Sequence, residues 1–280
     1  MFPVNISGMK HFMIKKYDMT FMYIPVLILS ILSVILYIVR LFHAAAANVL
    51  FFTCTTALLC FFIVSRVNAK AWKAVLILLA IFFSAVYFIL GDSLFSFAAE
   101  KFASACASFG FFDFLFNTAG IFDFETLVYQ TSYGGARLIG NELVCGVVNI
   151  VKADPQTDLI RYLSGRCIFL FALLGILLSE KKNFKVNLLI GALMLISGNP
   201  APALILLLFT SPPLYFLALL INFCAFIVSV LFEIKGAFVV SPSVFEIVYH
   251  SQNLVNFLAV GAVFCAVSYF AARIVKERKK

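Results

Sequence analysis

The stretch from Leu188 to Tyr215, LLIGALMLISGNPAPALILLLFTSPPLY, decides the fold of this chain. It is long and apolar enough to cross a bilayer, but Gly198–Pro202 interrupts its centre and a Pro-Pro pair stops it at 212–213. Proline removes a backbone donor and clashes inside a helix, and backbone groups freed in lipid must be satisfied by protein or water. Interrupted segments of this kind point to a transporter's binding site. We therefore expect a re-entrant hairpin with its tip near residue 200, with a kinked structural helix as the alternative.

Composition places the chain in a membrane. Of its 280 residues, 64% are hydrophobic and 12% are charged, whereas about a quarter of a soluble domain is charged. Lysine and arginine exceed aspartate and glutamate by 21 to 13. They gather at the ends of apolar runs, where they are orientation signals, so the excess predicts no nucleic-acid partner. Seven cysteines without a CxxC pair and three scattered histidines predict no metal site, no disulfide framework and no cofactor.

Six apolar segments are predicted to cross the membrane as helices: Phe21–Val39, Ala44–Val64, Ala74–Leu90, Leu159–Ser179, Leu214–Phe232 and Leu254–Ala272. The first is longer than the apolar core of about 7–15 residues in a signal peptide. We therefore expect this helix to be retained, with cleavage after it as the alternative. Arg161 and Arg166 fall in the fourth segment, and we expect their side chains to snorkel to the interface.

Residues 91–132 differ from these segments, because acidic residues recur within a Phe-rich run. Charge at membrane depth is costly and usually faces a bundle interior or a cavity, so this stretch is predicted to form a second re-entrant or amphipathic element. The predicted fold class is all-α, a polytopic membrane protein with about six spanning helices and two re-entrant hairpins. It divides into a three-helix N-terminal part, residues 1–90, and a hairpin-containing part, residues 91–280.

Four basic clusters test this count: Lys10–Lys16, Arg66–Lys73, Lys181–Lys185 and Arg273–Lys280. The positive-inside rule places all four in the cytoplasm, together with both termini of a protein in the inner membrane. Each cluster is separated from the next by two crossings only if the Phe-rich stretch 91–132 and the interrupted run 188–215 each enter and leave the membrane on one side. The C-terminal cluster is also expected to contact anionic lipid.

Two polar positions are the candidate binding groups. Asn199 is the only polar side chain between Ser197 and Thr210, and its amide can bond a hydroxyl as donor or acceptor. Glu125 lies in the alternating run FDFET, where it shares one face of an extended segment with Asp123. Glu125 is interpreted as a cavity-lining acceptor for sugar hydroxyls or a cation, with a solvated interfacial loop as the alternative. The sequence contains no Walker A loop, so ATP hydrolysis by the chain is excluded.

Five segments of the C-terminal half match, in order, the elements of one known family. They are LSGR at 163–166, the lysine loop at 181–185, Gly198 and Pro202 in the interrupted run, LLFTSPPLY at 207–215, and GAF at 236–238 continuing to Ile247. The family's elements are R-x-L-S-G-K, a basic loop, T-G-I-T-E-P-I-E-F, F-L-F-x-x-P-x-L-Y and G-x-x-F-S-x-G-x-x-D-F. Residues 108–280 thus resemble the membrane permease domain, enzyme IIC, of phosphotransferase-system sugar transporters, in the glucose, N-acetylglucosamine and maltose branch.

The resemblance implies that a hexose-type sugar binds between two re-entrant hairpins of a homodimer. The residues that it assigns to the two walls are Asn199, Pro200, Ala201 and Pro202 on one side and Glu125 and Thr126 on the other. No catalytic residue is assigned to this chain, which has no enzyme IIB cysteine motif. Phosphoryl transfer would need separate cytoplasmic IIB and IIA components.

The chain departs from the family pattern at the sugar-binding positions. Ala201 and Leu204 stand where the central motif has its two glutamates, and the family's hairpin histidines fall on Glu125 and Thr126. A different gap placement puts the histidines on residues 113–114, and no histidine is present there either. Losing a charged acceptor in a buried site costs roughly 1.5–3 kcal/mol. The alternative is therefore a divergent relative that senses sugar or acts as a scaffold without transport. A third reading is a transporter of another solute that works without phosphoryl transfer.

Overall fold

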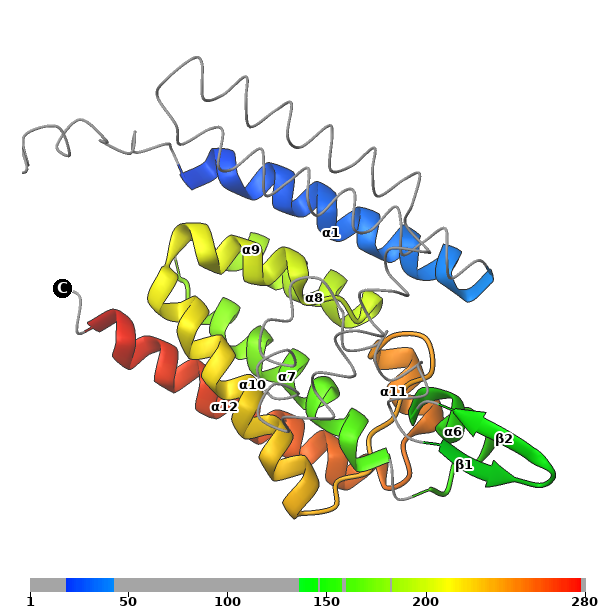
Figure 1. Ribbon diagram of the computed structural model, residues 1–280. Coiled ribbons are helices and arrows are strands. Elements are labelled where there is room, and N and C mark those ends of the chain that lie inside the picture. The colour runs from blue at the N-terminus through cyan, green and yellow to red at the C-terminus, as the bar shows by residue number, and fades with distance from the viewer. Residues whose placement is uncertain (1–18, 43–135, 146, 158–159, 182, 278–280) are drawn as a thin grey trace, which may run out of the picture.

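The structure, a computed structural model, describes residues 19–42, 136–145, 147–157, 160–181 and 183–277 (Figure 1). The predicted segments Ala44–Val64 and Ala74–Leu90 and the Phe-rich stretch 91–132 lie outside these residues. The described part is mostly helical. Its helices are α1 (Met19–Phe42), α6 (Val147–Ala153), α7 (Ile160–Leu178), α8 (Phe184–Ser197), α9 (Ala201–Thr210), α10 (Pro212–Leu231), α11 (Val244–His250) and α12 (Leu254–Glu277).

Two of the described helices, α10 and α12, are long and apolar enough to cross a membrane. Their 20 and 24 residues correspond to about 30 and 36 Å at 1.5 Å per residue, and a bilayer's hydrocarbon core is about 30 Å thick. Large apolar side chains such as Phe216, Leu220, Val263 and Phe270 are mostly exposed on them. Such outward apolar faces are typical of helices in lipid rather than in water. The segments Phe21–Val39 and Leu159–Ser179 are confirmed as helical, in α1 and α7; that they cross the membrane stays a prediction.

Helix α7 forms the centre of the bundle and packs against both α10 and α12. Gly165 lies against the Phe226 backbone of α10, and Gly175 lies against the Cys265 backbone of α12. Small residues allow such close approach between helices. The prediction that Arg166 snorkels to the interface is wrong, because its side chain is only 3% exposed inside the bundle. The side chain of Arg161 is outside the described part.

The predicted interruption is present, and it makes a helical hairpin. Helix α8 ends at Ser197, Gly198 takes a left-handed φ of 70°, and α9 begins at Ala201 after Pro200. Asn187 near the start of α8 and Thr210 at the end of α9 line the same cavity of about 40 Å³. The two helices therefore run antiparallel, with their open ends together and residues 198–200 at the tip. Figure 1 shows this hairpin alongside α1.

The bundle has two chemically different ends. The basic end holds the open end of the α8–α9 hairpin and the end of α12, where Lys276 Nζ lies 3.0 Å from Glu180 Oε2. The loop end holds the hairpin tip, the irregular segment 232–243, α11 and the start of α12. Helix α1 runs from one end to the other, since Tyr23 lines the cavity at the basic end and Tyr37 reaches Ser243 at the loop end.

The all-α prediction needs one correction, a two-stranded antiparallel sheet. Strand β1 (Ala136–Ile139) pairs with β2 (Glu142–Cys145), and Gly140 adopts a φ of 63° in the turn between them. A Gly-Asn pair between two short, mainly apolar runs favours such a hairpin. Arg137 Nη1 ties the sheet to the chain after α6 through Asp154 Oδ2 at 3.3 Å and Thr157 Oγ1 at 3.0 Å.

Candidate functional site

The tip of the α8–α9 hairpin presents the Asn199 side chain. Its Oδ1 accepts a hydrogen bond from Ala201 N–H at 3.0 Å, and its Nδ2 donates to Ser33 Oγ on α1 at 2.9 Å. The first bond satisfies one of the amides that every helix N-terminus leaves without an internal partner. The second joins the tip to a helix 166 residues away in sequence. Asn199 thus holds the break in shape and links it to α1.

The segment after α10 folds back against this tip. Ser241 Oγ donates to the carbonyl of Ser197 at 2.8 Å, which supplies a partner for a carbonyl at the end of α8. A Cβ on Gly198 would stand 2.4 Å from Ser241 Oγ and 2.6 Å from Ser243 N. The backbone of the tip and the backbone of residues 241–243 are therefore in direct contact, with no space for a side chain between them.

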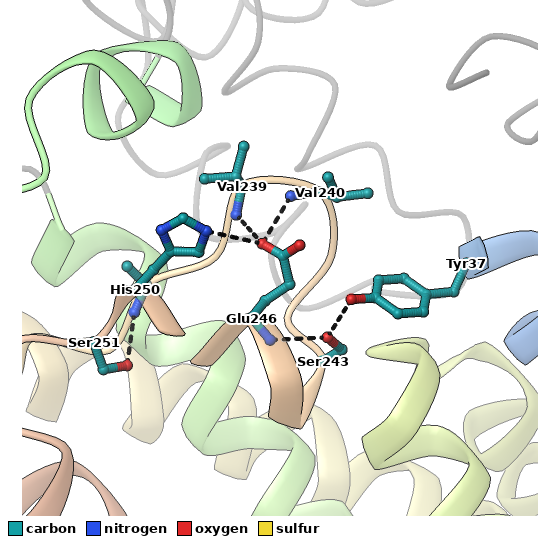
Figure 2. Close-up of polar contacts among 8 residues, drawn as sticks. Tyr37, Val239, Val240, Ser243, Glu246, His250 and Ser251 are labelled. Carbon is teal, nitrogen blue, oxygen red and sulfur yellow. Dashed lines mark hydrogen bonds and ion pairs between the residues drawn. The ribbon is translucent and has the colours of Figure 1, made fainter. Parts of the chain in front are cut away.

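The same segment encloses the carboxylate of Glu246, which is 9% exposed. Its Oε2 accepts from Val239 N–H at 2.9 Å and from Val240 N–H at 3.4 Å, and His250 Nε2 lies 3.6 Å away (Figure 2). Backbone amides that donate to a carboxylate oxygen fix its position. Glu246 is thus a buried acid held in place by the loop that precedes its own helix, α11, in sequence.

Helix α1 closes the cluster from the opposite side. Ser243 Oγ accepts from Glu246 N–H at 3.2 Å and donates to Tyr37 Oη at 3.0 Å. Ser33 and Tyr37 stand four residues apart on α1, so they share one face of that helix. This face contacts Asn199 through Ser33 and Ser243 through Tyr37, and it connects the hairpin tip to the Glu246 loop.

The structure brings only part of the predicted site together. Asn199 is half-buried and hydrogen-bonded, whereas Pro200, Ala201 and Pro202 are buried around the start of α9. The other predicted wall, Glu125 and Thr126, lies outside the described residues. Leu204, at the second glutamate position of the family motif, is fully buried in the core.

Sequence reasoning did not select the other polar residues of this cluster, which are Ser33, Tyr37, Ser241, Ser243 and Glu246. One signal was available. Ser243 and Glu246 form the S-x-x-E pattern of a capping box, and Ser243 does cap α11. The Glu246 carboxylate does not follow that pattern, because it binds the Val239 and Val240 amides instead of the amide of Ser243. No pattern in the sequence indicates that the Glu246 carboxylate binds the amides of Val239 and Val240.

The chemistry that this cluster offers is hydrogen bonding. Within a small region it combines a side-chain amide, several hydroxyls and a carboxylate, and all of these groups bond alcohols well. In the part of the chain that the structure describes, no three His, Cys, Asp or Glu side chains converge in a way that could hold a metal ion. The arrangement suits the binding of a polar, uncharged molecule that carries hydroxyl groups.

No family model, no curated protein and no solved structure matches the chain.

Proposed function

We propose that the chain is the membrane permease subunit, of enzyme IIC type, of a phosphoenolpyruvate-dependent phosphotransferase system. It carries a hexose-type sugar across the inner membrane as a homodimer, and a separate cytoplasmic enzyme IIB, served by IIA, phosphorylates the sugar. The observation that carries this proposal is the α8–α9 hairpin, whose tip places Asn199 at a cluster of hydroxyls and a buried carboxylate. Broken helices that meet at a polar cluster are a recurrent form of transporter binding site.

The dimensions of the hairpin support its re-entrant nature. With 14 and 10 residues, α8 and α9 are about 21 and 15 Å long, whereas the hydrocarbon core is about 30 Å thick. A hairpin of this size enters the membrane and returns without crossing it. Its non-helical tip is covered by protein, as membrane interiors require.

The distribution of charge supports an orientation with the basic end in the cytoplasm. Lys181, Lys185, Arg273 and Lys276 gather at that end with Glu180 and Glu277. The described residues of the loop end carry about as many acids as bases. Because lysine and arginine are retained on the cytoplasmic side, the tip of the hairpin points away from the cytoplasm. Helix α1, whose first residues lie at the basic end, then starts in the cytoplasm. The chain crosses the membrane several times.

A divergent relative without transport is the second candidate, and one observation favours it. Ala201 and Leu204, at the positions where the resemblance expects two glutamates, are completely buried in apolar surroundings. A protein that retains the fold and binds sugar, but does not release it on the other side, would act as a sensor or scaffold. Binding without uptake is the property that separates this function from the permease.

The first prediction concerns topology. In a cysteine-free background, single cysteines at the exposed positions Lys185 and Pro212 are expected to react with a membrane-impermeant thiol reagent from the same, cytoplasmic side. A cysteine at the exposed position Asn253, at the loop end, is expected to react from the opposite side. Lys185→Cys and Pro212→Cys labelled from opposite sides would mean that the hairpin crosses the membrane, which contradicts the proposed site.

The second prediction concerns transport. Cells that lack their own glucose and N-acetylglucosamine permeases, but keep the soluble phosphotransferase components, are expected to take up one of these labelled sugars when they express the chain. The matched control is the same strain with an empty vector. Binding of sugar by the purified protein without uptake supports the sensor or scaffold. If the protein neither binds sugar at millimolar concentration nor supports uptake, both functions are refuted.

A further inference from the structure

The sugar-binding positions expected from the family motif hold Ala201 and Leu204, which leaves the proposed permease without a carboxylate at the α9 side of its hairpin. Glu246 supplies a buried carboxylate from the segment that packs against the hairpin tip. Its Oε2 is held by Val239 N–H, Val240 N–H and His250. Figure 2 shows the second oxygen, Oε1, turned away from His250 toward the side on which Tyr37 lies.

Burial of this carboxylate costs free energy, which argues for a role beyond packing. Burying a charge costs free energy unless hydrogen bonds compensate it. Here an irregular loop, 239–243, arranges two amides around Glu246 and also packs against the hairpin tip through Ser241. An apolar residue at 246 would need none of these donors.

The contacts of α1 are the second independent observation. Asn199 bonds Ser33 and Ser243 bonds Tyr37, and in each bond both partners are side chains from distant parts of the sequence. Side chain–side chain bonds are only about 10–15% of the hydrogen bonds in proteins. Neither bond is needed to complete a helix or a turn. These two bonds keep polar groups of α1, the tip and the α11 loop paired while they face one another.

We propose that Glu246, Asn199 and Tyr37 together form the binding site for a neutral polyhydroxylated solute, with Glu246 Oε1 accepting a hydrogen bond from a solute hydroxyl. In the arrangement described, the groups satisfy one another across the interface between α1 and the two loops. A solute with several hydroxyls replaces the Asn199–Ser33 and Ser243–Tyr37 bonds when α1 moves aside. The inference rests on the proposed sugar permease and extends its site to residues of α1.

The test is sugar binding by the purified full chain, measured by calorimetric titration with glucose and with N-acetylglucosamine. Glu246→Gln keeps the size of the side chain and removes its charge, and it is expected to weaken binding about 10- to 100-fold. Tyr37→Phe keeps the ring and removes only the hydroxyl, and a loss of about fivefold is expected. Glu277→Gln is the matched control, because it removes the same charge from an exposed position at the basic end, and unchanged affinity is expected.

The outcomes separate this inference from the function on which it rests. If the wild type binds sugar and folded Glu246→Gln binds within twofold of it, the assignment of Glu246 is refuted while the permease proposal stands. If the wild type binds neither sugar at millimolar concentration, the proposed function fails and the inference fails with it. Should Glu246→Gln not fold, Tyr37→Phe decides, since an unchanged dissociation constant in that variant would overturn the site between α1 and the loops.

Discussion

Replacement of Gly198 by alanine is expected to destabilise the protein by about 2–5 kcal/mol. A non-glycine residue in the left-handed region costs about 1–2 kcal/mol, and Gly198 has a φ of 70°. The new Cβ would also stand 2.6 Å from Ser243 N and 2.7 Å from the Pro242 carbonyl carbon. These are backbone atoms that cannot rotate away, and overpacking of this kind costs typically 1–3 kcal/mol more. A lower apparent melting temperature in detergent would report the effect.

Gly140→Ala is the matched control for this variant. Gly140 has a similar φ of 63°, but a Cβ built on it would have no atom within 4 Å. The control therefore carries only the conformational cost, about 1–2 kcal/mol, at the turn of the β-hairpin. Equal shifts of the melting temperature for the two variants would show that the hairpin tip is not packed against residues 241–243, and the candidate site would be lost with that contact.

Replacement of Gly175 by alanine is expected to loosen the contact between α7 and α12. The new Cβ would stand 2.1 Å from the carbonyl oxygen of Cys265 and 2.9 Å from its carbon, so α12 must move. Alanine favours a helix over glycine by about 1 kcal/mol, but overpacking costs about 1–3 kcal/mol or more. A net loss of stability is expected, seen as a lower melting temperature and earlier proteolysis of the C-terminal helix.

Gly191→Ala provides the comparison, because it makes the same change inside a helix where the obstacle is movable. A Cβ there would stand 2.4 Å from Leu174 Cδ1, the end of a side chain that can adopt another rotamer. This variant gains the same helix propensity without meeting a backbone, so its stability is expected to stay unchanged or to rise. A Gly175→Ala protein as stable as Gly191→Ala would contradict the close packing of α7 on α12.

Local sequence rules predicted much of the helical framework. The runs at 21–39, 214–232 and 254–272 became α1, α10 and α12 because a long apolar segment has few alternatives to a helix. Gly198 and Pro200 interrupted the run Leu188–Tyr215 where expected, since both residues act through the backbone itself. The prediction that the Arg166 side chain reaches the interface was wrong, because snorkelling depends on which side of a helix is covered by neighbouring helices. The sheet at 136–145 was missed although Gly140 and Asn141 mark its turn.

The candidate site was less predictable for a physical reason. Asn199 was identified because it is isolated among apolar residues, a property of the sequence alone. Its partner Ser33 lies 166 residues away in sequence, and Tyr37 lies 206 residues from its partner Ser243. Nothing in the local sequence specifies such pairs. The direction of the Glu246 carboxylate depends on where the loop at 239–240 returns, which only the packed chain establishes.

The sequence by itself determined that this chain holds helices apolar enough to cross a membrane, that it is mainly helical, and that its longest informative run breaks near residue 200. Each of these follows from composition or from the backbone properties of glycine and proline, which act within a few residues. Tertiary structure decided for the hairpin against the kinked helix, and it alone decided that α1 lies along the two halves of the broken run and that Glu246 is buried beside their tip. Those features arise from contacts between segments far apart in sequence, where packing and hydrogen bonding select one arrangement among many that local rules allow.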